Sequence, residues 1–183
     1  MSRREDIFSD DNVEIMLDTF HDQRRAYAFQ TNPLGVWDAI WTEQAHEDST
    51  GNLTNFDPSF DTVWDSKGKL TAKGYVVWMA IPFKSLRFSP SQQQTWGIIL
   101  YRGILRENED DFWPQISRRV EGRLDHAATA HGLEGISPGG TCNSFLTACC
   151  ARSMRSTPPR IRQCRFSTIA RRSFVEAWTR SSS

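Results

Sequence analysis

The stretch TWGIILYRGIL, residues 95–105, decides the fold class because both of its alternating faces are apolar. β-branched and aromatic side chains fill it, and such residues favour extended backbone over helix. A strand that is apolar on both faces is typical of a position inside a sheet, with neighbours on either side. We therefore predict a long central β-strand here, and the rest of the chain is interpreted around it.

Flanking stretches repeat with the two-residue period of a strand. In NVEIMLDTF, residues 12–20, the apolar side chains Val13, Ile15 and Leu17 alternate with Glu14, Met16 and Asp18, which predicts a half-buried strand. Similar patterns lie at residues 25–32, 36–43, 60–70 and 74–81, separated by turn signals such as NPLG and KG. Strands every ten to fifteen residues without a helical period predict an all-β antiparallel β-sandwich.

Composition excludes several classes of protein. The 183 residues allow one domain, and a formal net charge of zero suggests no nucleic-acid partner. There is no run of 18 apolar residues, so we expect no transmembrane helix in this chain. The N-terminus is charged from its start and lacks the apolar core of a signal peptide, so the chain as written is expected to be cytoplasmic.

Charge and cysteine are distributed unevenly along the chain. Residues before Gly140 hold 14 Lys and Arg against 21 Asp and Glu, a net −7, whereas the remainder holds 8 Arg against Glu176, a net +7. All four cysteines also follow Gly140. We therefore predict a partial β-sandwich over residues 1–117, a linker with a short helical turn over 118–139, and a disordered tail over 140–183.

Three long stretches resemble one known family. They are RREDIFSDDNVEIMLDTFHDQRRAYAFQTNPLGV (residues 3–36), FDTVWDSKGKLTAKGYVVWMAIPFKSLRF (60–88) and QTWGIILYRGILRENEDDFW (94–113), with HGLEGISPG (131–139) as a shorter fourth. Together they cover about two thirds of the chain and resemble the family 9 carbohydrate-binding modules. The resemblance is closer still to the version at the N-terminus of bacterial outer-membrane proteins of unknown function, the DUF5916 group.

The resemblance carries expectations about what surrounds this chain. It implies that the first strands of the sandwich should precede Arg3, leaving an unpaired sheet edge. It also implies a long continuation after Gly139, a C-terminal outer-membrane barrel in the relatives, which are exported to the periplasm or outer membrane. Because residues from about 140 onward lose the family pattern, we interpret them as an out-of-frame translation.

Tryptophan is abundant, with seven residues, and indole rings stack on the C–H faces of sugars. Trp37 and Trp41 would lie on one strand face about 13 Å apart. Two interpretations stay open for such rings, a sugar platform or ordinary core, and Trp96 is expected in the core. The candidate carbohydrate-binding residues are Trp37, Trp41, Trp64 and Trp113, with Asn32, Asp38, Glu43 and Arg102 as polar partners for hydroxyl groups.

Acidic residues supply the candidate metal site. Asp10, Asp11, Glu14 and Asp18 cluster in the sequence, and carboxylates of this kind bind calcium, as modules of the resembled family often do. Solvated surface charge is the alternative, and no cofactor is required. No spacing identifies the pair of acids that glycoside hydrolysis needs, so we expect no enzymatic activity.

Three hypotheses for function follow. The first is non-catalytic binding of a polysaccharide or oligosaccharide, associated through the family with polysaccharide catabolism and glycosidases. The second is a structural or interaction sandwich of an outer-membrane protein. The third is a non-functional gene fragment.

Overall fold

The computed structural model describes residues 10–43, 56–57, 60, 62–72, 74–117, 122–136, 144–151 and 163–170. Apart from three 3-10 helices of three or four residues each, the regular structure in these segments consists of β-strands. Every strand pairing in the described segments is antiparallel. The predicted all-β antiparallel fold is therefore confirmed.

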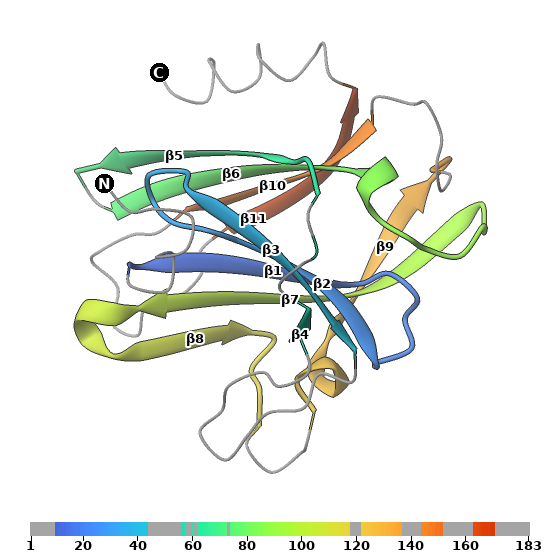
Figure 1. Ribbon diagram of the computed structural model, residues 1–183, viewed down its shortest axis with the longest axis horizontal. Helices are drawn as coiled ribbons and strands as arrows, with labels where there is room; N and C mark the ends of the chain where they lie inside the picture. Colours follow the sequence, from blue (N-terminus) through green and yellow to red (C-terminus); the bar gives the residue numbers. More distant parts are fainter. Residues whose placement is uncertain are drawn as a thin grey trace.

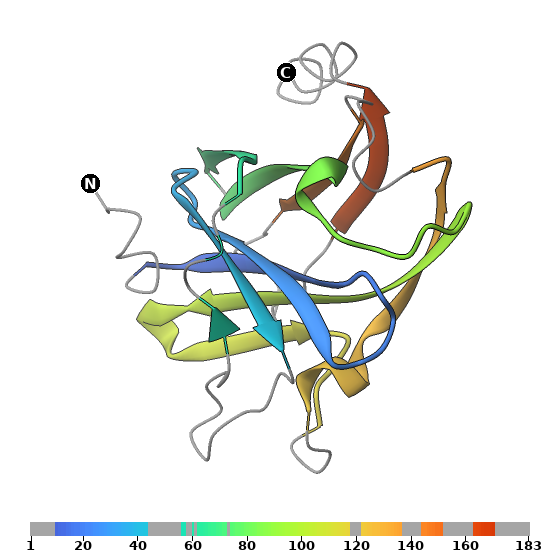
Figure 2. The same ribbon diagram turned by 45° about the vertical axis from the view of Figure 1, so that its right-hand side comes forward.

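The strands form two sheets. The larger sheet has the order β4-β3-β2-β1-β7-β8, with β9 also paired to β7, and the smaller has the order β11-β10-β6-β5. Figures 1 and 2 show the smaller sheet above the larger one from both directions. The bounds of the larger sheet are β1 (Asn12–Asp18), β2 (Arg25–Thr31), β3 (Trp37–Glu43), β4 (Phe56–Asp57), β7 (Gln93–Ile104), β8 (Glu109–Trp113) and β9 (Ala128–Glu134). Those of the smaller are β5 (Asp65–Thr71), β6 (Gly74–Pro82), β10 (Ser144–Ala151) and β11 (Gln163–Ala170).

Strand β7 occupies the interior of the larger sheet, as its sequence predicts. β1 pairs along one side of it from Asn12↔Gly103 to Asp18↔Gly97. Its other side is shared, because β8 pairs with the C-terminal half and β9 with the N-terminal half. β1 in turn pairs with β2 on its far side, so the expected unpaired edge does not fall on this strand.

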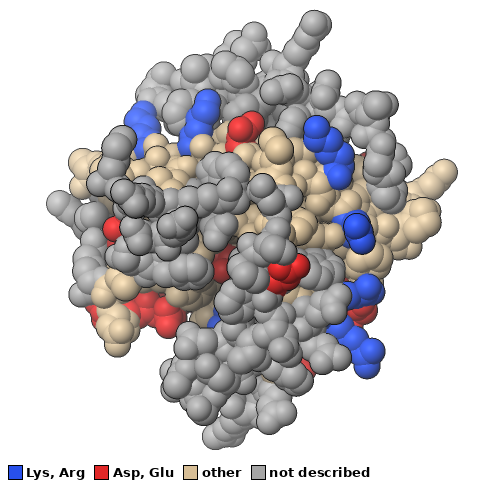
Figure 3. Space-filling model, in the orientation of Figure 1, with Lys and Arg blue, Asp and Glu red and all other residues tan. Residues whose placement is uncertain are grey.

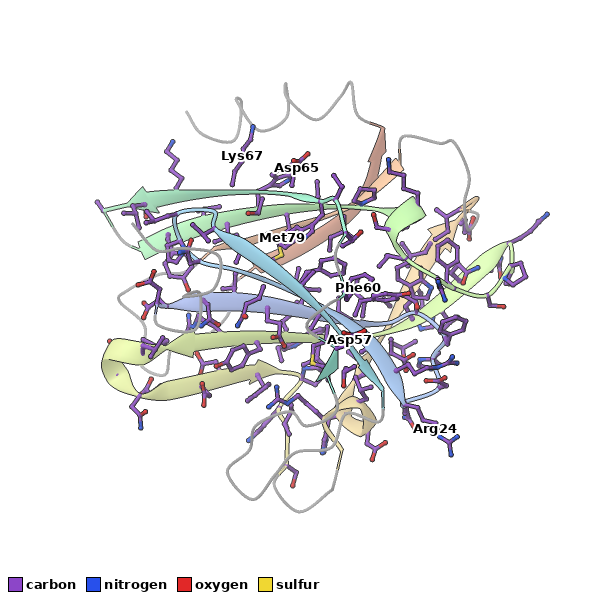
Figure 4. The ribbon with its side chains drawn as sticks, in the orientation of Figure 1. Arg24, Asp57, Phe60, Asp65, Lys67 and Met79 are labelled. Carbon is purple, nitrogen blue, oxygen red and sulfur yellow. The ribbon has the colours of Figure 1, made fainter. Side chains whose placement is uncertain are left out.

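A single apolar core fills the space between the two sheets. The larger sheet contributes Val13, Ile15 and Leu17 of β1, among others, and the smaller contributes alternate residues of β6: Tyr75, Val77, Met79 and Ile81. Figure 4 shows Met79 and Phe60 between the sheets, whereas Lys67 points outward from β5. Trp96 is fully buried against Phe83 and Phe88, which confirms its expected place in the core.

The opposite face of the larger sheet is also covered. Met16, Ala26, Ala28 and Ile99 pack there against Leu124, which belongs to the 3-10 helix η4 (Arg123–His126). All seven residues of β1 are consequently buried, and the prediction of a half-buried strand is wrong in this respect. Alternation alone could not reveal the covering segment, because that segment lies a hundred residues further along the chain.

Two further predictions differ from the structure. Strand β9 occupies part of the predicted linker, although η4 supplies its short helical turn. The tail was predicted to be disordered, yet β10 and β11 lie within it. β10 pairs with β6 from Phe145↔Pro82 to Ala151↔Val76. Backbone pairing of this kind satisfies the peptide groups of β6 without requiring an alternating pattern in the added strand. The remaining tail residues, 140–143, 152–162 and 171–183, lie outside the described part.

The helices of the described segments are short. They are η2 (Phe83–Ser85), η3 (Leu105–Glu107) and η4, and the longest has four residues. A bilayer-spanning helix needs about 20 residues. Within the described residues, no helix has the length and apolar character to cross a membrane.

The turn before β3 touches β5 at a glycine, and this contact is testable. A Cβ atom on Gly68 would lie 2.0 Å from the carbonyl oxygen of Pro33, which is backbone and cannot rotate away. Gly68→Ala is therefore expected to lower the free energy of unfolding by about 2–3 kcal/mol, as overpacking does. Urea denaturation measures this loss. Leu70→Ala, on the same strand and 64% exposed, is the control. An equal effect of the two substitutions would contradict the packing.

Candidate functional site

Trp113 differs from the other tryptophans whose side chains are described. It is 48% exposed at the end of β8, whereas Trp64, Trp78 and Trp96 are at most 5% exposed. β8 lies at the border of the larger sheet, where Leu100 of β7 is its neighbour. An indole ring in this position presents a flat apolar surface to a ligand at no cost in core packing.

Beside Trp113, Arg102 and Asp111 form an ion pair that joins β7 to β8. The two residues are register partners, and the Nη2 group of Arg102 donates a hydrogen bond to Oδ2 of Asp111. Arg102 is 2% exposed, so the guanidinium approaches from inside the protein, while the Asp111 side chain remains partly exposed. The Nε group of Arg102 is buried without a hydrogen-bond partner in the described structure. We call Arg102, Asp111 and Trp113 the β7–β8 site.

Acidic residues follow one another along β8, with Glu109 and Asp111 on the face of Trp113 and Asp110 on the other face. Tyr101 donates its hydroxyl to Oδ1 of Asp110 at 2.8 Å, and burial together with this carboxylate raises the pKa of the tyrosine. In Figure 3 acidic side chains gather at the lower left, where Figure 1 has the turn between β7 and β8. The site is thus an apolar ring bordered by carboxylates, with one guanidinium behind it.

The structure brings together two of the eight predicted carbohydrate-binding residues, Arg102 and Trp113. Trp64 is instead buried in the core, edge-on to Phe29 with ring centroids 5.2 Å apart. Asn32 is fully buried, and its Oδ1 accepts hydrogen bonds from the backbone N–H groups of residues 34 and 36, so it stabilises a turn. The other four lie on β3, whose strand is confirmed but whose side chains at these positions lie outside the described part: Trp37, Asp38, Trp41 and Glu43.

Asp111 is the member of the site that sequence reasoning missed. The structure places it on β8, opposite Arg102 of β7. A signal was present, since Glu109, Asp111 and Trp113 have the two-residue spacing that puts side chains on one face of a strand. The stretch was too short and too acidic for this period to stand out.

The four predicted metal ligands are not brought together. Asp10 and Asp11 lie before β1, whereas Asp18 ends it, seven residues away from Asp11. The Asp18 carboxylate accepts backbone N–H groups of residues 20, 22 and 23, and Asp11 accepts the N–H of Leu105. In the described segments no group of three or more His, Cys, Asp or Glu side chains is arranged to hold a metal ion. Calcium binding stays a prediction.

Glu14, the fourth of these acids, lies in a buried polar cluster on the outer face of the larger sheet. It is 7% exposed, and its Oε1 atom has no hydrogen-bond partner among the described residues. Gln30 next to it donates to Oδ1 of Asn12 at 3.0 Å. Burial raises the pKa of the Glu14 carboxyl, and the positive charge of Arg123 opposes this effect only in part.

A groove of about 560 Å³ lies elsewhere, where the loop before β7 meets the end of β9. It is lined by Pro90, Ser91, Gln92, Gln93, Glu134, Gly135 and Ile136. None of the predicted site residues reaches it, and its lining contains no aromatic ring. Polar groups of this kind can hold a ligand, but the groove offers no flat surface for a sugar ring.

Comparisons with known proteins do not assign a family to this chain. The scan against protein-family models, the search of curated proteins and the search of solved structures found no match. Any assignment of function therefore rests on the residues of this chain and their arrangement.

Because Glu14 is buried, we predict that the stability of the folded protein depends on pH. A carboxyl whose pKa is higher in the folded than in the unfolded chain costs no stability below the unfolded value, near 4.5. As the pH rises through the folded value, the charged form is buried and stability falls. We expect Glu14→Gln to raise the melting temperature at pH 7 and to change it little at pH 4.

Thermal melts between pH 4 and pH 8 measure this difference. Glu134→Gln, which neutralises an exposed carboxylate on β9, is the matched control and should leave the pH profile unchanged. A Glu14→Gln protein less stable than the parent at pH 7 would show that the carboxylate has a stabilising partner in solution.

Proposed function

We propose that this protein binds carbohydrate without turning it over, and that the β7–β8 site is where the sugar ring rests. The single observation behind this proposal is the half-exposed Trp113 ring beside a carboxylate that Arg102 holds in place. Sugar recognition combines an apolar ring face with charged or polar acceptors for hydroxyl groups. Arg102, Asp111 and Trp113 supply that combination on two adjacent strands.

The energetics of such a site favour Trp113 as its centre. An aromatic ring adds contact energy through both area and the polarisability of its π-system. Asp111 accepts hydrogen bonds from hydroxyl groups, and its ion pair with Arg102 limits its rotation, so less side-chain entropy is lost on binding. A site already organised in this way binds more tightly than one that a ligand must assemble.

The resemblance to family 9 carbohydrate-binding modules supports the same proposal. The stretch 94–113, which carries part of the resemblance, forms β7, η3 and β8 and therefore contains the whole site. The finer fold that we propose is a sandwich of this family, for which two antiparallel sheets around one core are a suitable frame. In this setting the module would anchor a polysaccharide while another protein degrades it.

Binding without turnover suits the chemistry of Asp111. Glycoside hydrolysis requires one carboxyl to keep a proton that it gives to the leaving group, with a second carboxylate facing it. Asp111 is ion-paired to a buried guanidinium, and no second carboxylate is its register partner across β7. The role that we propose for it is therefore recognition.

A structural or interaction role is the second candidate, and one observation favours it. Trp64, Trp78 and Trp96 are interior, so much of the aromatic content serves the core rather than a surface. A protein of this kind would contact other proteins through its exposed faces and bind no glycan. Affinity electrophoresis in gels containing soluble glycans separates the two roles, because only a glycan-binding protein is retarded.

Trp113→Ala tests the proposed site. Loss of a stacking ring is expected to weaken glycan binding by at least about tenfold, or about 1.4 kcal/mol. Because Trp113 is half exposed, the melting temperature should change little. Retardation in glycan gels, and titration followed by tryptophan fluorescence, measure the affinity.

Leu34→Ala provides the matched control, since Leu34 is an apolar residue that is 60% exposed on a turn outside the site. It should bind like the parent protein. Unchanged affinity in Trp113→Ala would move the binding surface elsewhere, and the absence of retardation by any glycan would favour the structural role.

A further inference from the structure

From the charges around Trp113 we infer that the glycan bound at the β7–β8 site carries free amino groups. This inference rests on the proposed function and narrows it to one class of ligand, the amino-polysaccharides. A protonated amine on a sugar ring would lie between the indole of Trp113 and the carboxylates of Asp111 and Glu109. The following geometry and charges lead to it.

The spacing along β8 places two acceptors beside the ring. Glu109, Asp111 and Trp113 alternate with Asp110 and Phe112, so the first three share one side of the strand. Successive members of this row are about 6.6 Å apart along the strand. A sugar ring stacked on Trp113 therefore brings a substituent at its edge within reach of Asp111, and the next ring within reach of Glu109.

An indole face beside a carboxylate recognises a cation in two ways. The ring attracts an ammonium group through its quadrupole, and the carboxylate attracts it through its charge. Asp111 uses Oδ2 for Arg102, and its side chain remains 28% exposed, which leaves room for a second donor. Arg102 is buried behind it and presents no positive group to the ligand.

The local charge is negative even after Arg102 is counted. On the face of the sheet that carries Trp113, Glu109 and Asp111 stand against one arginine, Arg102, which leaves a net −1. A ligand with ammonium groups gains from this field, whereas a glycan with carboxylate or sulfate groups is repelled. A neutral glycan gains only the stacking contact with Trp113.

The burial of Arg102 and its ion pair with Asp111 make this charge arrangement fixed rather than adaptable. A guanidinium that is 2% exposed and already paired cannot turn outward to meet an anion. It can only hold Asp111 in place. The site therefore presents carboxylate oxygens to the ligand, beside the ring of Trp113 and in front of the buried guanidinium.

Three oligosaccharides of equal length and linkage separate the contribution of a charged amino group to binding from that of the sugar ring itself. The first is a β-1,4 glucosamine oligomer, the second its N-acetylated form, in which the amine is neutral, and the third a β-1,4 glucose oligomer. At pH 6 in low salt the full-length protein is expected to bind the glucosamine oligomer about five- to tenfold more tightly than either of the others, from one exposed ion pair and one cation–π contact.

Glu109→Gln is the variant of choice, because Glu109 is exposed and has no structural partner in the described residues. It should lower the affinity for the glucosamine oligomer and leave that for the glucose oligomer unchanged. Asp111→Asn should lower this affinity more strongly, although it also removes the ion-pair partner of the buried Arg102. Glu134→Gln on β9 serves as the charge-matched control. Raising the salt to 0.5 M should shrink the preference.

The binding of the three oligomers by the parent protein and the variants tests the inference. Equal binding of the three oligomers, or tighter binding of the acetylated form, overturns the inference and leaves glycan binding intact. Retention of the preference in both Glu109→Gln and Asp111→Asn also overturns it. No binding of any oligomer overturns the proposed function together with the inference, and tight binding of a lysine-rich peptide without any glycan would assign the site to a protein partner.

Discussion

The fold depends on β7 being covered on both faces and paired along both edges. Trp96, Ile98 and Leu100 face the core between the sheets, whereas Ile99 faces the opposite layer. A strand of this kind loses apolar contact wherever either layer is missing, and buried apolar area is the largest favourable term in folding. The two sheets and the covering segment around Leu124 are therefore consequences of one stretch of sequence.

Buried polar side chains fix the geometry of the turns around this core. Asp18 collects three backbone N–H groups at the turn from β1 to β2, where His21 and Gln23 have left-handed backbone angles. Asn32 does the same at the turn before β3. These residues looked like metal or sugar ligands because carboxylates and amides serve both purposes. In the structure they accept hydrogen bonds from turn N–H groups, which would be costly if left unpaired inside the protein.

The border strand β8 carries both an ion pair to the buried Arg102 and the exposed ring of the proposed site. Asp111 compensates the buried charge of Arg102, and breaking a pair of this kind leaves a guanidinium in the interior without its partner. The same carboxylate is partly exposed and lies on the strand face that also carries Trp113. Glu14, by contrast, is buried on the other face of the same sheet without an equivalent partner for Oε1 among the described residues. Within one sheet, one carboxylate thus has a direct ion-pair partner, whereas burial disfavours the charged form of the other.

The sequence alone determined the all-β class, the central place of β7 and the burial of Trp96. These features follow from local periodicity and local apolar content, which act over a few residues. Only the tertiary structure decided that β9, β10 and β11 pair with distant strands, that Trp64 and Asn32 are interior, and that Asp111 meets Arg102. Each of those outcomes depends on which strands become neighbours, and neighbours in a sheet are chosen by packing and backbone pairing across the whole chain.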